Sequence, residues 1–323
     1  MVVGSGSLRF ELIADWPRRP DGLSQPDVAA VGVSSTGEAY LFCRAEHPVQ
    51  VFSAGSGELL RTWGEDAFDR GSAHGLQVDA DDTVLTVDMV RHTVERYAPD
   101  GTLLARIGTP GVASDTGHTG GQGGRNVLRS AGPFNRPADV CLDASGRIYA
   151  ADGYGNARVH RFAPDGTLEA SWGEPGRGAG CFAVPHGVAL LPDGNLIVAD
   201  RENNRLQIMT TEGEFLGAWT GVQRPCQVFV DADGLVFVAE LGRRAGETTL
   251  YGEVAPADLP SRVSVLSPDG DLLLRWSDGF VAAHDLWVDA DGSLYVAEVT
   301  HTMGVARGLV PPGTPAIHKF GRL

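Results

Sequence analysis

The sequence predicts an all-β protein in which a single domain, residues 1–323, forms a six-bladed β-propeller. A unit of about 40 residues recurs six times along the chain. Each copy alternates apolar and polar residues around Asp-Gly turns, as antiparallel hairpins do. No helical period of useful length competes with this pattern. The copies begin at Ala29, His74, Ala138, His186, Cys226 and His284.

Each copy predicts the four strands of one blade. HGVALLPDGNLIVAD from His186 contains the first two strands, and the second strand ends in an acid. A third strand and a Pro-Asp-Gly type of turn follow, and fourth strands such as GELLRTWG and GTLEASWG complete the blade. The sixth copy stops at IHKF, while LRFELIADWP from Leu8 carries the missing pattern. We therefore expect the N-terminal segment to complete the last blade.

Two stretches, residues 109–135 and 241–261, do not fit the repeat and both follow strand ends. We expect two long loops that shape the mouth of a pocket on one face. The first stretch contains GGQGGRN at residues 120–126, which lacks the GK[ST] ending and the following helix of a phosphate loop. We interpret it as an insertion without a phosphate role.

Composition excludes several classes of function. A formal net charge of −15 would repel a nucleic-acid backbone, so no nucleic-acid partner is expected. Lys319 is the only lysine and lies in a strand-like segment, which disfavours Schiff-base chemistry. The four cysteines are far apart, so we expect reduced, buried thiols rather than disulfides or a thiolate zinc site.

The chain has no apolar run of the roughly 18 residues that a membrane span needs, and its start lacks a signal pattern. We therefore expect a cytoplasmic protein that acts on a small molecule without a membrane partner. Composition leaves monomer and dimer both open.

Histidine occupies every second blade when the copies are aligned on their first strands. Alternate blades of a six-fold ring face the axis roughly 120° apart, so His74, His186 and His284 converge at one level. Three neutral imidazoles without a thiolate suit Zn²⁺ in an open, catalytic site. Iron, manganese or cobalt could use the same ligands. Three hydrogen-bonded core histidines are the alternative.

Two unusual residues follow the ends of second strands. Those ends carry an acid in nearly every blade, and such recurrence favours a structural role for the acids. Arg44 follows Cys43, and Tyr154 follows Asp152 in DGYGNAR, on the face that carries the histidines. A cation and a phenol beside a metal predict an active site. The alternatives are a structural ion pair for Arg44 and a packed aromatic for Tyr154.

The sequence resembles the NHL-repeat propellers and, among them, the peptidyl-α-hydroxyglycine α-amidating lyase family, over essentially all six blades. The matching segments are HGL at His74, DGYGNARV at Asp152, WGEPGRGAGCFAVPHGVAL around His186, ADRENNRLQ at Ala199 and HDLWV at His284. The resemblance implies a zinc ion on His74, His186 and His284, with Arg44 and Tyr154 at the same site. It also implies a structural Ca²⁺ on the backbone carbonyls of Val31 and Leu76 and the carboxylate of Asp285, which are oxygen ligands.

The chain departs from the family pattern at three points. Ala282 and Ala283 stand where the family has a Met-Pro pair, so the wall of the pocket differs. Gly155 replaces a cysteine of the animal enzymes. The copper hydroxylase domain that makes the substrate in animals is absent from this chain, so we expect a substrate other than a peptide.

These observations predict a zinc-dependent lyase that cleaves the C–N bond of an α-hydroxyglycine-type amide to an amide and glyoxylate or a related oxo acid. Zinc would bind the carbinol oxygen, Tyr154 would take its proton, and Arg44 would anchor a carboxylate or stabilise developing charge. A metal-dependent lactone or ester hydrolase is one alternative, although such sites usually include metal-bound carboxylates. A non-catalytic propeller that binds proteins is the other.

Overall fold

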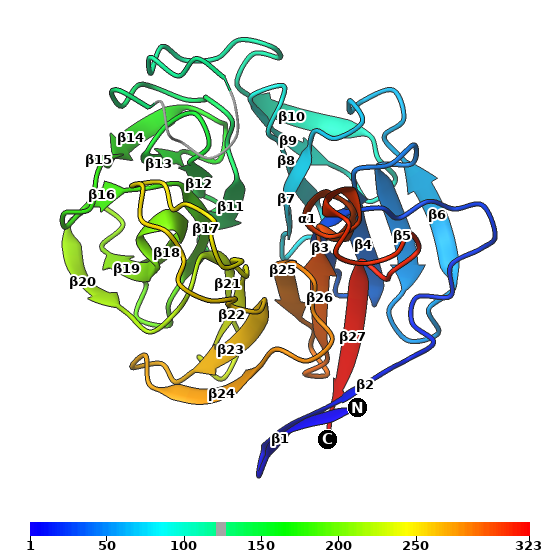
Figure 1. The fold of residues 1–323 in the computed structure, drawn as a ribbon. Coiled ribbons are helices and arrows are strands. Elements are labelled where there is room, and N and C mark those ends of the chain that lie inside the picture. The colour runs from blue at the N-terminus through cyan, green and yellow to red at the C-terminus, as the bar shows by residue number, and fades with distance from the viewer. Residues whose placement is uncertain (121–126) are drawn as a thin grey trace.

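The computed structural model describes residues 1–120 and 127–323, and their strands form six antiparallel sheets around a central axis (Figure 1). The segment GGQGGRN lies outside the described residues apart from Gly120. Blades 1 to 3 comprise β3 (Val28–Val33), β4 (Glu38–Cys43), β5 (Val49–Ser53) and β6 (Leu59–Trp63); β7 (Ala73–Val78), β8 (Val84–Asp88), β9 (Thr93–Tyr97) and β10 (Leu103–Ile107); and β11 (Asp139–Leu142), β12 (Ile148–Asp152), β13 (Arg158–Phe162) and β14 (Leu168–Trp172).

The second half of the chain repeats this plan. Blades 4 and 5 comprise β17 (Pro185–Leu190), β18 (Leu196–Asp200), β19 (Arg205–Met209) and β20 (Phe215–Trp219); and β21 (Pro225–Val230), β22 (Val236–Glu240), β23 (Arg262–Leu266) and β24 (Leu272–Trp276). A two-stranded parallel pair, β15 (Glu174–Pro175) and β16 (Cys181–Phe182), lies between blades 3 and 4 in sequence. The predicted six-bladed, all-β architecture is confirmed.

The last blade closes the ring with both ends of the chain. It contains β25 (Ala283–Val288), β26 (Leu294–Glu298), β27 (Ile317–Arg322), β2 (Leu8–Leu12) and β1 (Val2–Ser5). Since β2 pairs with β27, the N-terminal segment completes blade 6 as expected, and both termini lie together (Figure 1). The extra strand β1 was not expected from the repeat. It pairs with β2 and extends this sheet to five strands.

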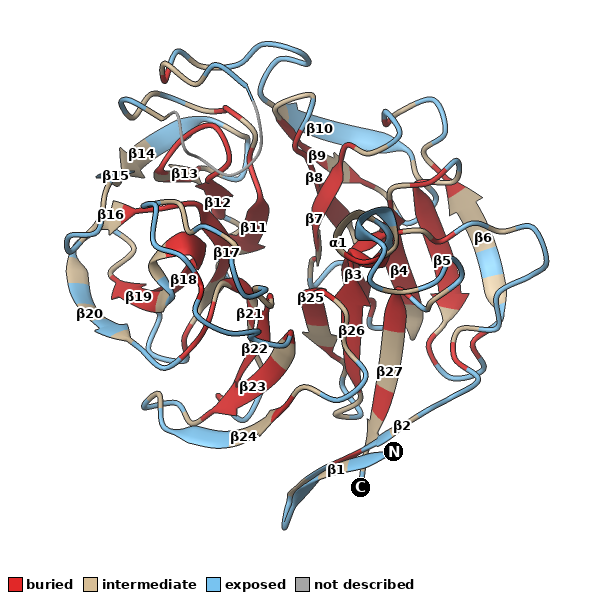
Figure 2. Ribbon diagram, in the orientation of Figure 1, coloured by how far each residue is buried: buried red, intermediate tan, exposed pale blue. Residues whose placement is uncertain are grey.

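The inner strands carry the core, and the outer strands face solvent (Figure 2). β8, β12, β18, β22 and β26 are buried along their whole lengths, whereas β10 is almost entirely exposed. Cys43, Cys141 and Cys226 are buried free thiols, but Cys181 is only partly buried, which corrects the expectation of four buried cysteines. None of the helices in the described ranges is long and apolar enough to cross a membrane.

A glycine–tryptophan contact recurs between neighbouring blades. Gly101 has a positive φ of 89° in its turn, and a Cβ there would lie 2.8 Å from the ring of Trp63 in the preceding blade. Gly213 and Gly270 meet Trp172 and Trp219 in the same way. Glycine is therefore needed in these turns both for its backbone conformation and for the close approach of the indole.

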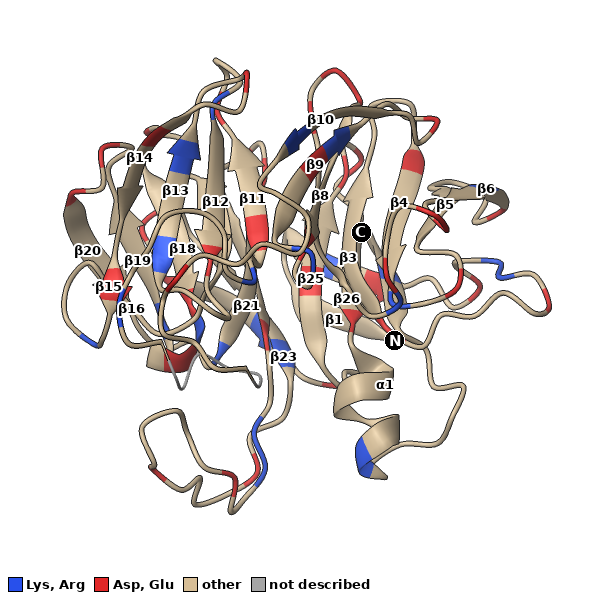
Figure 3. Ribbon diagram, turned by 90° about the horizontal axis from the view of Figure 1, so that it is seen from above, with Lys and Arg blue, Asp and Glu red and all other residues tan. Residues whose placement is uncertain are grey.

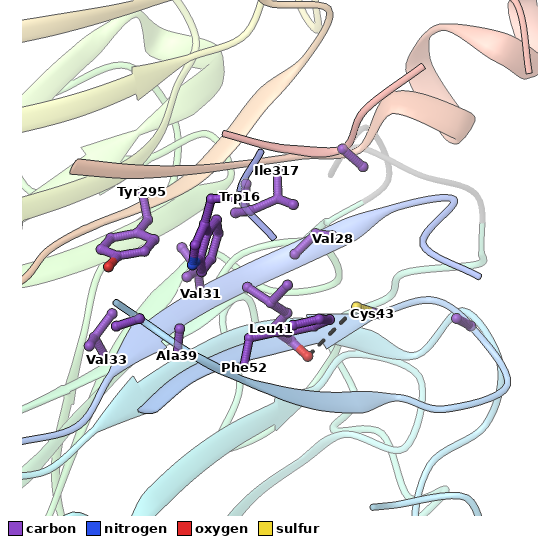
Figure 4. Packing of buried hydrophobic residues seen from close by; sticks show 14 residues of the cluster. Trp16, Val28, Val31, Val33, Ala39, Leu41, Cys43, Phe52, Tyr295 and Ile317 are labelled. Carbon is purple, nitrogen blue, oxygen red and sulfur yellow. Dashed lines mark hydrogen bonds between the residues drawn. The ribbon is translucent and has the colours of Figure 1, made fainter. Parts of the chain in front are cut away.

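Trp16, in the N-terminal segment, makes the same kind of contact with a glycine. A Cβ on Gly57 would lie 3.0 Å from the Trp16 ring, so Trp16 takes the position of the tryptophans that end other fourth strands. Its ring lies 4.9 Å from that of Tyr295 in blade 6 and 6.5 Å from that of Phe52 in blade 1 (Figure 4). Buried Trp→Ala changes cost about 3–5 kcal/mol, so this contact contributes substantially to ring closure.

The acids at the ends of second strands hold the loops that lead into the first strands. Asp152 accepts hydrogen bonds from the backbone N–H of Asn135 at 3.0 Å, and Asp200 from that of Ala183 at 2.7 Å. Glu298 accepts from the N–H of Ala282 at 2.5 Å. These contacts support the structural role that recurrence suggested, and they position the segments that precede the axial strands.

Candidate metal centre

His74, His186 and His284, here called the histidine triplet, meet on the axis. They come from β7, β17 and β25, and their ring centroids lie 4.8 to 4.9 Å apart. All three side chains are buried. In each of these strands the pairing register shifts at the histidine, and such bulges redirect a side chain away from the regular alternation. The histidines that occupy every second blade in the sequence therefore form one cluster in the structure.

Backbone carbonyls of the neighbouring blades fix the orientation of each ring. Nδ1 of His74, His186 and His284 lies 2.7, 2.8 and 2.7 Å from the carbonyl oxygens of Ala138, Cys226 and Ala29, respectively. These three acceptors occupy the same repeat position as the histidines, one blade further on. A carbonyl can only accept, so Nδ1 carries the proton and the lone pair of Nε2 is available to a ligand.

Glycine after two of the histidines makes this contact possible. A Cβ on Gly75 would lie 2.6 Å from the carbonyl oxygen of Ala138, and one on Gly187 would lie 2.7 Å from that of Cys226. These are the same oxygens that accept the Nδ1 protons of His74 and His186. A larger residue would push the neighbouring blades apart and lengthen both hydrogen bonds.

The three rings are neutral at neutral pH. Burial, with a smaller contribution from the Arg44 charge, lowers the pKa of His284 to about 3. Burial also lowers the pKa values of His74 and His186 well below the usual range, with neighbouring histidines and the Arg201 charge adding to the effect. Neutral imidazole is the form that binds a metal ion.

Tyr154 brings its hydroxyl to the histidine triplet. Its Oη lies 3.1 Å from Nε2 of His74 and 3.0 Å from Nε2 of His186, and it accepts a hydrogen bond of 2.8 Å from Nη1 of Arg201. The hydroxyl has one proton, whereas two imidazole lone pairs face it. Three converging nitrogen lone pairs with one shared proton form a donor set that fits a borderline-soft cation such as Zn²⁺.

Arg44 lies beside the triplet and also makes an ion pair. Its Nε donates to the carbonyl oxygen of Ala73 at 3.2 Å, next to His74, and its Nη1 lies 3.6 Å from the carboxylate of Asp27. The same side chain lines the cavity that contains Tyr154 and His284. Arg44 thus both forms an ion pair and lies at the site.

The cavity above the histidine triplet has a volume of about 210 Å³. Much of its wall comes from a single repeat position, the residue after the end of each second strand. Five of the six residues at that position line the cavity: Arg44, Met89, Arg201, Leu241 and Val299. Gly153 is the sixth, and Tyr154 follows it. These residues share the cavity wall because the equivalent strand ends of a propeller meet at the mouth of its central channel.

Arg201 was missed by the sequence reasoning although it occupies the position that identified Arg44. It follows Asp200 just as Arg44 follows Cys43. Arg201 belongs to η1 (Arg201–Asn203), is buried, and holds the Tyr154 hydroxyl. Comparing this position across all six copies would have found it.

Of the two predicted pocket loops, the structure places one at the cavity. Arg243, Thr248 and Leu250 of the loop 241–261 line it, together with Thr302 and Met303 of the segment that includes α1 (Thr300–Met303). Figure 3 shows this loop and α1 projecting from the same face. The described part of 109–135 does not line this cavity. Its Val127 lines a second cavity, of about 250 Å³, with Leu250 and Tyr251.

The residues implied for calcium lie further along the axis. Val31 and Leu76 are buried, and so is Asp285, the residue after His284. Burial raises the pKa of Asp285 well above its usual range, and the nearby Asp139 carboxylate adds to this rise. Two buried carboxylates close to each other form a site that a cation would stabilise.

The departure at Ala282 lies behind the cavity wall. Ala282 packs with Cys226, Leu241 and Val299, and Met303 packs against that cluster. Leu241, Val299 and Met303 also line the cavity, whereas Ala282 does not. The wall is therefore completed by side chains from other segments.

Comparison with known proteins finds a matching repeat model and relatives that cover most of this chain. A model of the NHL repeat matches residues 134–162 and 182–209. NHL repeat-containing protein 3 of Mus musculus is 30% identical over 307 residues, which cover 90% of this chain and 81% of that protein. Peptidylglycine α-amidating monooxygenase of Rattus norvegicus is 30% identical over 241 residues and 64% of this chain.

Two further comparisons concern proteins named as lyases. Peptidyl-α-hydroxyglycine α-amidating lyase 1 of Drosophila melanogaster is 28% identical over 79% of this chain and 47% of that protein. The chain spans only 16% and 23% of the mouse and rat monooxygenases. Among solved structures, a streptogramin B lyase has a TM-score of 0.58 at 15% identity and covers 93% of this chain and 95% of that one, a likeness of fold.

Proposed function

The chain belongs to the family of NHL-repeat six-bladed propellers that resemble the peptidyl-α-hydroxyglycine α-amidating lyases, and we propose that it is a metal-dependent carbon–nitrogen lyase. Its substrate is a small α-hydroxyglycine-type amide, and its products are an amide and glyoxylate or a related oxo acid. The observation that carries the proposal is the convergence of three neutral imidazoles and a tyrosine hydroxyl, next to a cavity that His284, Tyr154 and two arginines line.

His74, His186 and His284 would hold the metal ion through Nε2, and zinc is the metal that we propose. The ion supplies Lewis-acid chemistry, which favours loss of a proton from a hydroxyl group. Asp285, with the carbonyls of Val31 and Leu76, is the proposed site of a second, structural Ca²⁺ ion. Oxygen-only ligation suits this hard cation.

Tyr154 is the proposed general base. Its Oη is already at the histidine triplet, and the Arg201 guanidinium at 2.8 Å stabilises negative charge that develops on this oxygen. When Oη takes the proton of the carbinol hydroxyl, its own proton passes to the amide nitrogen, the former O–H electron pair forms the carbonyl of the oxo acid and the C–N bond breaks. The nitrogen leaves with the bonding pair as the neutral amide and Tyr154 is again a hydroxyl, so atoms and charge balance.

Arg44 orients the substrate. Its guanidinium lies in the cavity wall next to His284, where a planar fork can bind the carboxylate on the carbinol carbon in a bidentate manner. The burial of the triplet keeps bulk water from competing with the carbinol. No nucleophile from the protein is required, because the bond breaks by elimination.

The hydrolase alternative lacks an equivalent observation. Propeller hydrolases that activate water usually bind their metal partly through carboxylates. In this chain the repeat position of the triplet offers histidine, alanine and cysteine. The carboxylates on the axis, Asp139 and Asp285, belong to a separate position one residue further along.

The test is to incubate the purified protein with an N-acyl-α-hydroxyglycine and to measure glyoxylate and amide. We expect the two products in equal amounts, and loss of both after treatment with a chelator. A panel of lactones and esters serves as the comparison. Hydrolysis of that panel without release of glyoxylate would favour the hydrolase.

A further inference from the structure

Three arginines of the cavity wall share one carboxylate. Arg201, Arg224 and Arg243, here called the arginine cluster, surround Glu202. The Glu202 carboxylate accepts from Nε of Arg201 at 3.0 Å, from Nη2 of Arg224 at 2.9 Å and from Nη2 of Arg243 at 3.0 Å. The cluster joins η1 of blade 4 to the segment before β21 and to the loop after β22. All four residues line the cavity.

The cavity carries more positive than negative charge. Among the described residues that line it, four are arginines and one is a glutamate. The fourth arginine, Arg44, has Asp27 as its ionic partner. Four guanidinium groups therefore face two carboxylates, which leaves two positive charges in a chain whose formal net charge is −15.

These charges are shielded from water. The side chains of Arg201, Arg224 and Arg243 are 5%, 14% and 10% exposed, and that of Glu202 is 7% exposed. Buried guanidinium groups that lack a full counter-charge are costly, and an anionic ligand relieves that cost. Their planar geometry matches carboxylate and phosphate groups.

The two sources of positive charge lie on opposite sides of the axis. Arg44 belongs to blade 1, whereas Arg201 belongs to blade 4, and these blades face each other across a ring of six. Apolar side chains of Leu241, Leu250 and Val299 line the cavity as well. Its volume of about 210 Å³ is below the roughly 300–1,000 Å³ of sites for drug-sized ligands.

We propose that the substrate is a small dianion, an N-acyl-α-hydroxyglycine whose short acyl chain ends in a second anionic group, a carboxylate or a phosphate. Arg44 binds the carboxylate on the carbinol carbon, and Arg243 and Arg224 bind the second anion. This assignment of the carbinol end rests on the proposed lyase function. Arg243 is the specificity-determining residue, because it lies on the loop that covers the cavity and holds Glu202 through one nitrogen only.

The test compares anions that differ only at one end. Calorimetry on the protein as purified measures the binding of butyrate, glutarate and 3-phosphonopropionate. We expect one of the two dianions to bind at least about tenfold more tightly than butyrate, as a charged hydrogen bond would give. Whichever dianion binds more tightly identifies the second group as a carboxylate or a phosphate, and either result supports the proposal. Equal affinity for all three anions overturns it.

Two neighbouring arginines provide a matched pair of variants. Arg243→Gln is expected to abolish the preference for dianions while the affinity for butyrate stays the same. Arg244→Gln is the control, since that side chain is 52% exposed and pairs weakly with Asp258 at 4.0 Å. Thermal melting checks that both variants fold, and Arg243→Lys is expected to recover part of the preference. A preference that survives in Arg243→Gln overturns the proposal.

Glyoxylate release separates this proposal from the proposed function. N-succinyl-α-hydroxyglycine should have a kcat/KM at least about tenfold above that of N-butyryl-α-hydroxyglycine. If neither compound yields glyoxylate but the calorimetric preference depends on Arg243, the lyase function is wrong and the dianion site stands. If both are cleaved equally well, the lyase function stands and the dianion proposal is wrong.

Discussion

The histidine triplet and the arginine cluster meet at the same cavity but are held in opposite ways. The triplet consists of neutral rings, each oriented by a backbone carbonyl of the next blade. The cluster consists of permanent charges oriented by one buried carboxylate, Glu202. The triplet therefore presents lone pairs to a cation, and the cluster presents N–H groups to an anion. Tyr154 connects them, because its hydroxyl contacts both His186 and Arg201.

The largest expected effect comes from removing the group that joins the two regions. Tyr154→Phe keeps the ring and removes the hydroxyl, so glyoxylate formation should fall by roughly 10²–10⁴-fold, the usual contribution of a general base. Metal content should stay unchanged, because His74, His186 and His284 remain. Activity close to that of the wild type would separate Tyr154 from the chemistry.

Glu202 tests whether charge pairing holds the arginine cluster together. Burial by itself raises the pKa of Glu202, but the charges of Arg201, Arg224 and Arg243 outweigh it and bring the pKa down to about 2 from 4.5. The ionised carboxylate therefore stabilises the fold above about pH 4.5, by about 3 kcal/mol, and this stabilisation disappears as pH falls towards 2.

The measurement is the free energy of unfolding of wild type and Glu202→Gln across that range. The variant should be less stable at pH 7, and the difference should shrink between pH 4.5 and pH 2. A difference that does not depend on pH would mean that the cluster is held by packing rather than by charge.

Arg44 tests the binding of the substrate on the other side of the cavity. Arg44→Lys keeps the positive charge but removes the planar fork, so KM should rise by about 10- to 100-fold, the range of a charged hydrogen bond. The kcat should change less, since Tyr154 and Arg201 are untouched. A fall in kcat at constant KM would instead assign Arg44 to stabilising charge in the transition state.

The smallest expected effect concerns Asp285. If Ca²⁺ binds there, its addition at tenfold the dissociation constant should stabilise the protein by about 1.4 kcal/mol. Asp285→Asn should lose this calcium-dependent stabilisation and keep the ligands of the histidine triplet. Asp289→Asn, at the partly buried turn after β25, is the control. Equal stabilisation of all three proteins by Ca²⁺ would place the ion elsewhere.

The repeat explains what the sequence could predict. Blade number, closure by the Leu8 segment and the convergence of the three histidines all follow from a register that every copy shares. Arg44 and Tyr154 were found because they are unusual side chains just after the ends of second strands. Arg201 could have been found by the same comparison, since it shares the repeat position of Arg44.

Other parts of the site had no such register. Arg224 lies just before β21 and Arg243 in the long connection after β22. Contacts with Glu202, and a hydrogen bond of 3.0 Å from Nη1 of Arg224 to the carbonyl oxygen of Gly242, bring them together. The short helix α1, which adds Met303 to the cavity wall, also lies in a long connection, the one between β26 and β27. Periodicity cannot reveal residues of this kind, because their positions depend on how the loops fold over the ring.

The central claim is that the histidine triplet holds a catalytic metal ion. Metal content of protein purified without chelator or affinity metal tests it most directly, for wild type, His186→Ala and His47→Ala, whose exposed histidine is the control. The account predicts about one zinc ion per chain in wild type and His47→Ala and almost none in His186→Ala, since two imidazoles remain of the three that an open zinc site uses. Absence of stoichiometric metal in the wild type, or equal metal in His186→Ala, would contradict it.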